Sequence, residues 1–224
     1  MKKYLFSMFI LLGMLVSLTS CSSDEKNDGN FSISQSEVVV NVKTGSAQLS
    51  ASPNDVEWSS ENPYVAAVTK SGKVLGIHVG ETNIVASRGG SVKKCKVTVT
   101  PQYTTFKEPL VEFGKSKEYI ISKLGTPDKQ FENMIAYGNR DDFQVTFYEF
   151  SKGKLSKCMV SLDASNEKVL QLPIFFTERY EMRPEKVNGM RLYYNASRET
   201  DATTLVLLDE EVSGGRLWVY YTKR

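Results

Sequence analysis

The sequence predicts a mixed protein, with an all-β sandwich at residues 31–101 followed by an α+β domain at residues 102–224. Short runs of alternating apolar and polar residues, broken by turn residues, fill the first segment. The second segment reads as a helix followed by three strands, and this helix-β-β-β pattern then occurs again. An antiparallel sheet with its helices packed on one face would bury both halves of that pattern.

Composition and charge narrow the classes of protein that the chain can be. It has 224 residues, with 28 Lys and Arg against 26 Asp and Glu, a formal charge of +2. Lys2 and Lys3 account for this excess, so removal of residues 1–20 would leave 204 residues with no net charge. A nucleic-acid-binding protein normally carries a basic patch. We therefore expect no nucleic-acid partner.

The first 20 residues have the pattern of a signal peptide. Lys2 and Lys3 precede a mainly apolar run at residues 4–16, which is shorter than the roughly 20 residues of a membrane-spanning helix. A short transmembrane anchor is the alternative. The run ends in Leu18-Thr19-Ser20-Cys21, which resembles the bacterial lipobox. The resemblance implies cleavage before Cys21 and acylation of its thiol and amine, and thus a lipid anchor at the outer membrane of the cell envelope.

Residues 21–30 are polar and are expected to form a flexible tether behind the anchor. The acidic pair Asp24-Glu25 is similar to the export signal of surface lipoproteins in some Gram-negative bacteria. That similarity implies exposure on the cell surface, with the periplasmic side as the alternative. Cys95 and Cys158 lie at apolar positions of different predicted domains, so we expect buried free thiols rather than a disulfide between them.

The first domain is expected to contain only strands, because no helical period occurs in it. The expected strands lie at residues 38–42, 47–51, 56–60, 64–69, 73–78, 81–87 and 91–99. Two segments are similar to the signature of bacterial immunoglobulin-like domains of group 2. The first runs from Val56 through Trp58 and Asn62-Pro63 to Val68, and the second runs from Gly72 to Ile84.

This resemblance implies an immunoglobulin-like sandwich with Trp58 in its core. Such domains occur in adhesins, as spacers in secreted glycan-active enzymes, and in many lipoproteins. A single copy next to an anchor implies a spacer or scaffold. The only histidine, His78, lies in this segment. Without neighbouring ligand-type residues it is expected to be a surface residue, and we expect no metal site.

The second domain begins after a linker at residues 103–109. Ser116 can cap a helix that Gly125 and Pro127 would end. Strands are expected at residues 132–138, 142–150 and 154–163, followed by a second helix at 166–180 that Pro173 interrupts. Further strands are expected at residues 188–195, 203–208 and 215–222. Similar helix-plus-meander units occur in small outer-membrane assembly lipoproteins and in β-lactamase inhibitor proteins.

The sequence contains none of the common catalytic motifs. Its single histidine lies apart from most candidate nucleophiles. The consecutive carboxylates at Asp141-Asp142 and Asp209-Glu210-Glu211 lie beside turns. We therefore expect a protein that is not an enzyme and that needs no cofactor.

An aromatic strand near the C-terminus provides the candidate ligand site. Arg216, Trp218 and Tyr220 alternate with Leu217, Val219 and Tyr221, so one of the two sets must face the core. If helices cover the Leu217 side, the first set forms an open platform suited to sugar rings or a protein partner. Otherwise Trp218 belongs to the core. The predicted function is a lipid-anchored binding or adhesion module, with a periplasmic assembly or inhibitor-type lipoprotein as the alternative.

Overall fold

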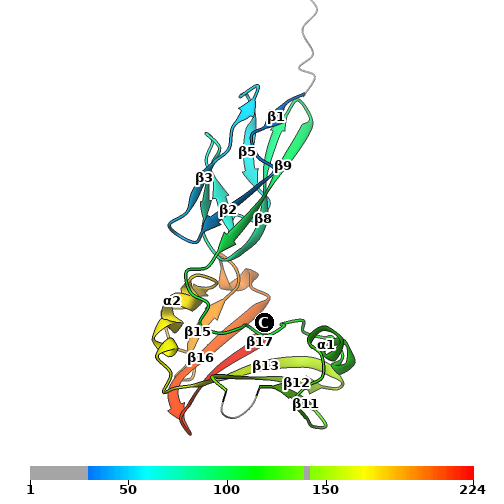
Figure 1. Cartoon of the computed structure of the whole chain (residues 1–224), viewed down its shortest axis with the longest axis vertical. Helices are drawn as coiled ribbons and strands as arrows, with labels where there is room; N and C mark the ends of the chain where they lie inside the picture. The colour runs from blue at the N-terminus through cyan, green and yellow to red at the C-terminus, as the bar shows by residue number, and fades with distance from the viewer. Residues whose placement is uncertain (1–29, 139–141) are drawn as a thin grey trace, which may run out of the picture.

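The computed structural model describes residues 30–138 and 142–224. The predicted signal peptide, Cys21 and nearly all of the tether lie outside the described residues, as does Asp141. The described chain forms two units stacked along its long axis (Figure 1). The upper unit is a β-sandwich, and the lower unit, which we call the sheet unit, is built on one large sheet (Figure 1).

The sandwich packs two main sheets against each other. Its four-stranded sheet has the order β2 (Glu37–Asn41), β9 (Ser91–Thr100), β8 (Gly80–Arg88) and β5 (Glu57–Ser60). Its three-stranded sheet has the order β3 (Ser46–Gln48), β7 (Lys73–Gly76) and β6 (Ala66–Val68). The short strands β1 (Ser32–Ile33) and β4 (Ala51–Ser52) pair with each other. Strand β2 runs parallel to β9, and the other pairs are antiparallel.

Alternating residues of these strands form the sandwich core, which includes Val40, Val97 and Ile84, and Trp58 packs against it. Gly72 must be a glycine for two reasons. Its φ is +82°, and a Cβ there would lie 2.4 Å from the carbonyl oxygen of Leu49. The strands predicted for this segment are present. Gly72, which belongs to the segment similar to the group 2 signature, lets the backbone pass close to Leu49.

The sheet unit contains one eight-stranded antiparallel sheet. In sheet order its strands are β10 (Lys129–Gln130), β11 (Met134–Tyr137), β12 (Gln144–Ser151), β13 (Lys154–Asp163), β17 (Arg216–Lys223), β16 (Thr204–Ser213), β15 (Arg191–Tyr194) and β14 (Glu181–Met182). Two α-helices accompany it, α1 (Lys117–Leu124) and α2 (Leu172–Thr177). Two short 3-10 helices, Glu167–Gln171 and Glu199–Asp201, complete the unit.

The α+β class predicted for residues 102–224 is wrong. Strands take 48% of the described residues and helices only 11%, so the protein is mainly β. The helix expected at 166–180 is a 3-10 turn followed by the six-residue α2, which begins next to Pro173 because proline is tolerated only in the first turn of a helix. The edge strands β10 and β14 were not predicted, because two residues are too few to show an alternating pattern.

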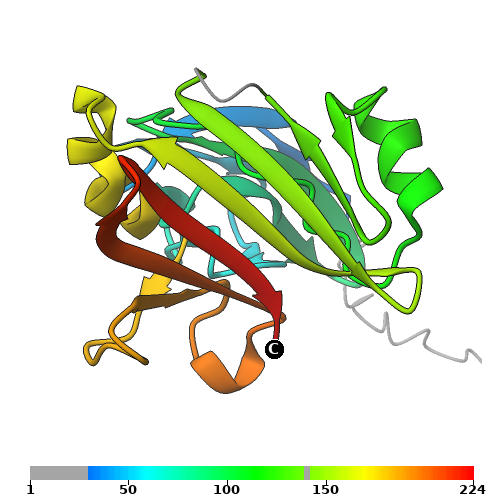
Figure 2. The same cartoon turned by 90° about the horizontal axis from the view of Figure 1, so that it is seen from below.

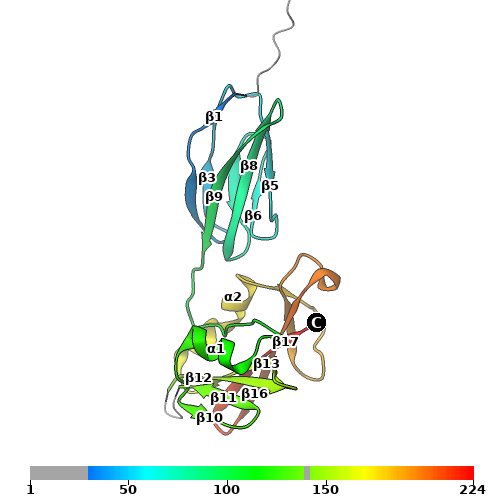
Figure 3. The same ribbon diagram turned by 90° about the vertical axis from the view of Figure 1, so that its right-hand side faces the viewer.

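The core of the sheet unit lies on one face of its sheet, where the helices pack. Ile120 from α1 and Phe175 and Phe176 from α2 join Val219 and Tyr221 from β17 in this core. Helix α2 lies between the sheet and the sandwich (Figure 3). Seen from below, the opposite face of the sheet lies in front of the sandwich and no helix crosses it (Figure 2).

Both cysteines in the described residues are buried and free, as predicted. Burial raises the pKa of the Cys158 thiol to about 12, so this thiol stays protonated and unreactive. No helix within residues 30–138 and 142–224 is long and apolar enough to cross a membrane.

Candidate functional site

Strand β17 places the predicted platform on the face of the sheet that the helices leave open. Val219 and Tyr221 are fully buried in the core, and Leu217 packs against that core. Arg216, Trp218 and Tyr220 alternate with them and are half-buried on the opposite face. Of the two arrangements that the sequence left open, the structure therefore has the one in which helices cover the Leu217 side.

Phe147 on β12 adds a third aromatic ring to those of Trp218 and Tyr220 on β17. We call these three rings the aromatic row. The ring centroids of Phe147 and Trp218 are 5.8 Å apart, and their planes are tilted by 31°. The ring centroids of Trp218 and Tyr220 are 6.4 Å apart, and their planes are nearly parallel. Trp218 pairs with Ser161 on β13, whose small side chain leaves room for the indole to reach Phe147 on the next strand. Sequence reasoning missed Phe147 because only the strand register brings β12 near β17.

Arg216 supports this face and does not point freely into solvent. Its Nε donates to Ser161 Oγ at 2.9 Å, and its Nη2 donates to the Ser161 carbonyl oxygen at 3.0 Å. Its Nη1 donates to the carbonyl oxygen of Asp142 at 3.0 Å. The guanidinium thus links the ends of β17 and β13 to the segment that precedes β12. Its position fits a supporting role more closely than the direct ligand contact that the sequence suggested.

A groove of about 570 Å³ opens beside the Phe147 end of the aromatic row. Such a volume lies in the usual range for small-molecule sites, about 300–1,000 Å³. Its lining combines aromatic side chains with charged ones: Phe131, Phe147, Trp218, Lys129, Asp163 and Arg216. Phe131 is 53% exposed. Hydrogen bonds from the backbone amide and hydroxyl of Ser165 lower the pKa of Asp163, so this carboxylate is ionised and can accept hydrogen bonds from a ligand.

The orientation of this face depends on a second set of residues, at the junction between the two units. Glu178 follows α2 directly and is only 1% exposed. Its carboxylate accepts hydrogen bonds from the backbone amides of Gln102 and Tyr103, at 3.2–3.3 Å, in the linker that leaves the sandwich. A negative charge is unfavourable at the C-terminal end of a helix. The linker amides and the Arg179 guanidinium, whose Nη1 lies 3.4 Å from a Glu178 carboxylate oxygen, provide the stabilisation that the helix end does not.

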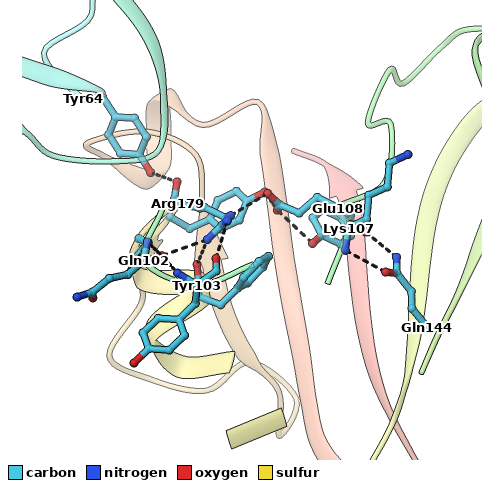
Figure 4. Close-up of polar contacts among 11 residues, drawn as sticks. Tyr64, Gln102, Tyr103, Lys107, Glu108, Gln144 and Arg179 are labelled. Atoms are coloured by element: carbon cyan, nitrogen blue, oxygen red, sulfur yellow. Dashed lines mark hydrogen bonds and ion pairs between the residues drawn. The ribbon is translucent and has the colours of Figure 1, made fainter. Parts of the chain in front are cut away.

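Arg179 completes the attachment of the linker (Figure 4). Its Nη2 donates to the carbonyl oxygen of Tyr103 at 3.1 Å, and its Nε lies 3.3 Å from a carboxylate oxygen of Glu108. Its Nη1 donates to the carbonyl oxygen of Phe175, one of the unpaired acceptors at the end of α2. Desolvation raises the pKa of the Glu108 carboxyl, although hydrogen bonding to Tyr180 and the charge of Arg179 act in the opposite direction.

Two loops of the sandwich contact the same short segment. The amide of Val79 donates to the carbonyl oxygen of Glu178 at 2.8 Å, and the hydroxyl of Tyr64 donates to that of Arg179 at 2.9 Å (Figure 4). The prediction that His78 is a surface residue is wrong. It is 4% exposed, stacks on Tyr64 and lies 3.6 Å from Glu181, because its loop packs against the sheet unit.

Comparison with known proteins identifies the upper unit. Residues 29–99 match the family model of the bacterial Ig-like domain (group 2). The sandwich is a bacterial Ig-like domain. This confirms the resemblance drawn from Trp58 and the glycines that follow it. Domains of this group indicate a cell-surface module of binding or adhesion type, are typically extracellular, and are typically not catalytic.

No curated protein matches the chain. Among solved structures, a cysteine-rich secretory protein from Staphylococcus aureus is 16% identical over 53% of this chain, with a TM-score of 0.28, and the chain covers 46% of that protein. Domains 5–6 of the S-layer protein SbsC are 14% identical over 87% of this chain and 83% of theirs, with a TM-score of 0.27. In the part of the chain that the structure describes, no cluster of three or more His, Cys, Asp or Glu side chains could hold a metal ion.

The junction makes a direct prediction about stability. Glu178→Ala should lower the free energy of unfolding by about 3 kcal/mol, because the backbone amides of Gln102 and Tyr103 lose the buried carboxylate that accepts their hydrogen bonds. Calorimetry of the purified protein measures this loss. Glu185→Ala is the matched control, since the Glu185 side chain is 79% exposed and should contribute almost nothing. Equal melting temperatures for the two variants would show that Glu178 does not hold the linker.

Proposed function

We propose that this protein is a lipid-anchored protein of the bacterial cell envelope and that it acts as a binding or adhesion module, not as an enzyme. In this proposal Cys21 carries the lipid, the Ig-like domain is the stalk, and the sheet unit presents a ligand-binding face at the far end. The observation that carries the proposal is the position of the aromatic row, which lies on the face of the sheet turned away from the Ig-like domain (Figure 2).

The arrangement suits presentation away from a membrane. The described chain begins at the end of the sandwich that is remote from the sheet unit (Figure 1). An anchor on Cys21 would therefore hold that end near the membrane, while the open face of the sheet would point outward. Aromatic side chains half-exposed on a β-sheet bind ligands at a small conformational cost, because few rotatable bonds are fixed.

The anchor is tested by metabolic labelling with a fatty-acid analogue. The wild-type chain should incorporate the label, and Cys21→Ala should lose it, because no thiol remains at the end of the signal peptide. Ser22→Ala, which changes the neighbouring residue and leaves the lipobox intact, should stay labelled. Label that persists in Cys21→Ala would refute the anchor. Protease treatment of intact cells then separates the two membrane faces, since a protein that resists the protease lies on the periplasmic side.

The binding face is tested by hydroxyl-radical footprinting of intact cells. The side chain of Trp218 should be oxidised more slowly on intact cells than in the purified protein, because on cells a bound ligand covers it. Trp58 is a suitable internal reference, since it is the only other tryptophan and lies in the Ig-like domain. A Trp218 oxidation rate that changes no more than that of Trp58 would mean that nothing binds this face.

A further inference from the structure

We propose that the groove between Phe131, Phe147 and Trp218 is a carbohydrate site that takes the pyranose rings of a neutral polysaccharide. This inference rests on the proposed binding function and specifies its ligand.

The groove has a floor that is ordered before any ligand arrives. The indole of Trp218 has two aromatic neighbours, Phe147 and Tyr220. The two hydrogen bonds from Arg216 to Ser161 hold the strand pair under the indole in register. A preformed site of this kind loses little conformational entropy when it binds a ligand.

Three glycines form part of the groove lining. Gly214 and Gly215 form the tip of the β16–β17 hairpin, and an added Cβ at either position would have no neighbour within 4 Å. Gly138 must be a glycine, because its φ is +98° and a Cβ there would lie 2.6 Å from the carbonyl oxygen of Gln144. The hairpin tip thus borders the aromatic surface without covering it.

The chemistry of the lining matches a sugar ring. A pyranose has apolar C–H groups on its faces and hydroxyl groups around its rim. The face of an aromatic ring carries partial negative charge, so it attracts the weakly positive C–H groups. The Asp163 carboxylate can accept hydrogen bonds from hydroxyl groups, and the exposed Lys129 ammonium can donate them. Aromatic surface and polar groups of both kinds therefore line the same groove.

Charge and surface area favour this ligand over others. All three guanidinium nitrogens of Arg216 donate hydrogen bonds to Ser161 or Asp142 within the protein. Together with Lys129 and Asp163, Arg216 gives the groove a formal charge of only +1, short of the cluster of cations that suits an acidic glycan or a phosphate. Of the large apolar side chains that are exposed on the described residues, only Phe131 lines the groove. A typical protein partner would cover roughly 800 Å² of this chain, with an apolar centre. One exposed apolar side chain does not form such a centre, so the groove suits a sugar ring better than a protein.

Affinity electrophoresis of the full-length protein in detergent tests this inference. Native gels contain laminarin, galactomannan, xylan or pullulan, which are neutral or nearly neutral, or alginate, which is acidic. At least one of the first four should retard the wild-type protein. Trp218→Ala should weaken that binding by at least about tenfold, in line with the loss of one stacked aromatic ring. Val212→Ala changes another exposed apolar side chain outside the groove and should bind like wild type.

Two further measurements separate loss of the site from loss of the fold. Lys129→Gln changes only an exposed side chain, so it should keep the melting temperature of the wild type while weakening binding severalfold. In a Trp58→Phe background Trp218 is the only fluorescent indole, and its emission should shift to the blue as the retarding polysaccharide saturates the site.

The outcomes distinguish this inference from the proposed function. Binding to alginate alone, or retardation that Trp218→Ala leaves unchanged, would overturn the carbohydrate site as proposed. If none of the neutral polysaccharides binds while Trp218 is still protected on intact cells, the carbohydrate assignment fails and the binding function stands. If Trp218 is not protected and no polysaccharide binds, both fail.

Discussion

The hydrogen bonds from the linker amides to the buried carboxylate of Glu178 determine how the two units are placed. A carboxylate enclosed in protein is costly unless its oxygens are paired, and here backbone amides of Gln102 and Tyr103 pair with it. Arg179 holds the carbonyl oxygen of Tyr103 and lies beside Glu108. Glu178 and Arg179, at the end of α2, thus hold the linker at Gln102 and Tyr103. The loops of the Ig-like domain contact the same two residues at the end of α2.

This attachment gives the aromatic row its direction. The helices fill the side of the sheet that faces the Ig-like domain, so the side chains of β17 are divided between a buried set and an outward set. Trp218 belongs to the outward set, on the face of the sheet opposite the one that the helices cover. If the linker swung freely, the aromatic row could point in any direction. With the linker attached, the face stays turned away from the anchored end, as a presentation role requires.

The sequence was most informative where a pattern is local. Trp58 and the glycines after it identified the Ig-like domain, and Ser116 and Gly125 marked both ends of α1, where they form the N-cap and the C-cap. The class of the second segment was wrong, because a helix interrupted by proline and two-residue edge strands leave almost no periodic signal. Phe147 joins the site and His78 leaves the surface through contacts between distant segments, which no local pattern encodes.

The central claim is that the junction fixes the open face relative to the Ig-like domain. Spin labels on Lys93→Cys and Glu211→Cys, both exposed and one in each unit, report this directly by pulsed electron spin resonance. Cys95 and Cys158 are buried and should not be labelled. The distance distribution should be narrow in the wild-type background and broad when Glu178→Ala is added. A broad distribution in the wild-type background would mean that the linker behaves as a flexible chain, and the account of the presented face would be wrong.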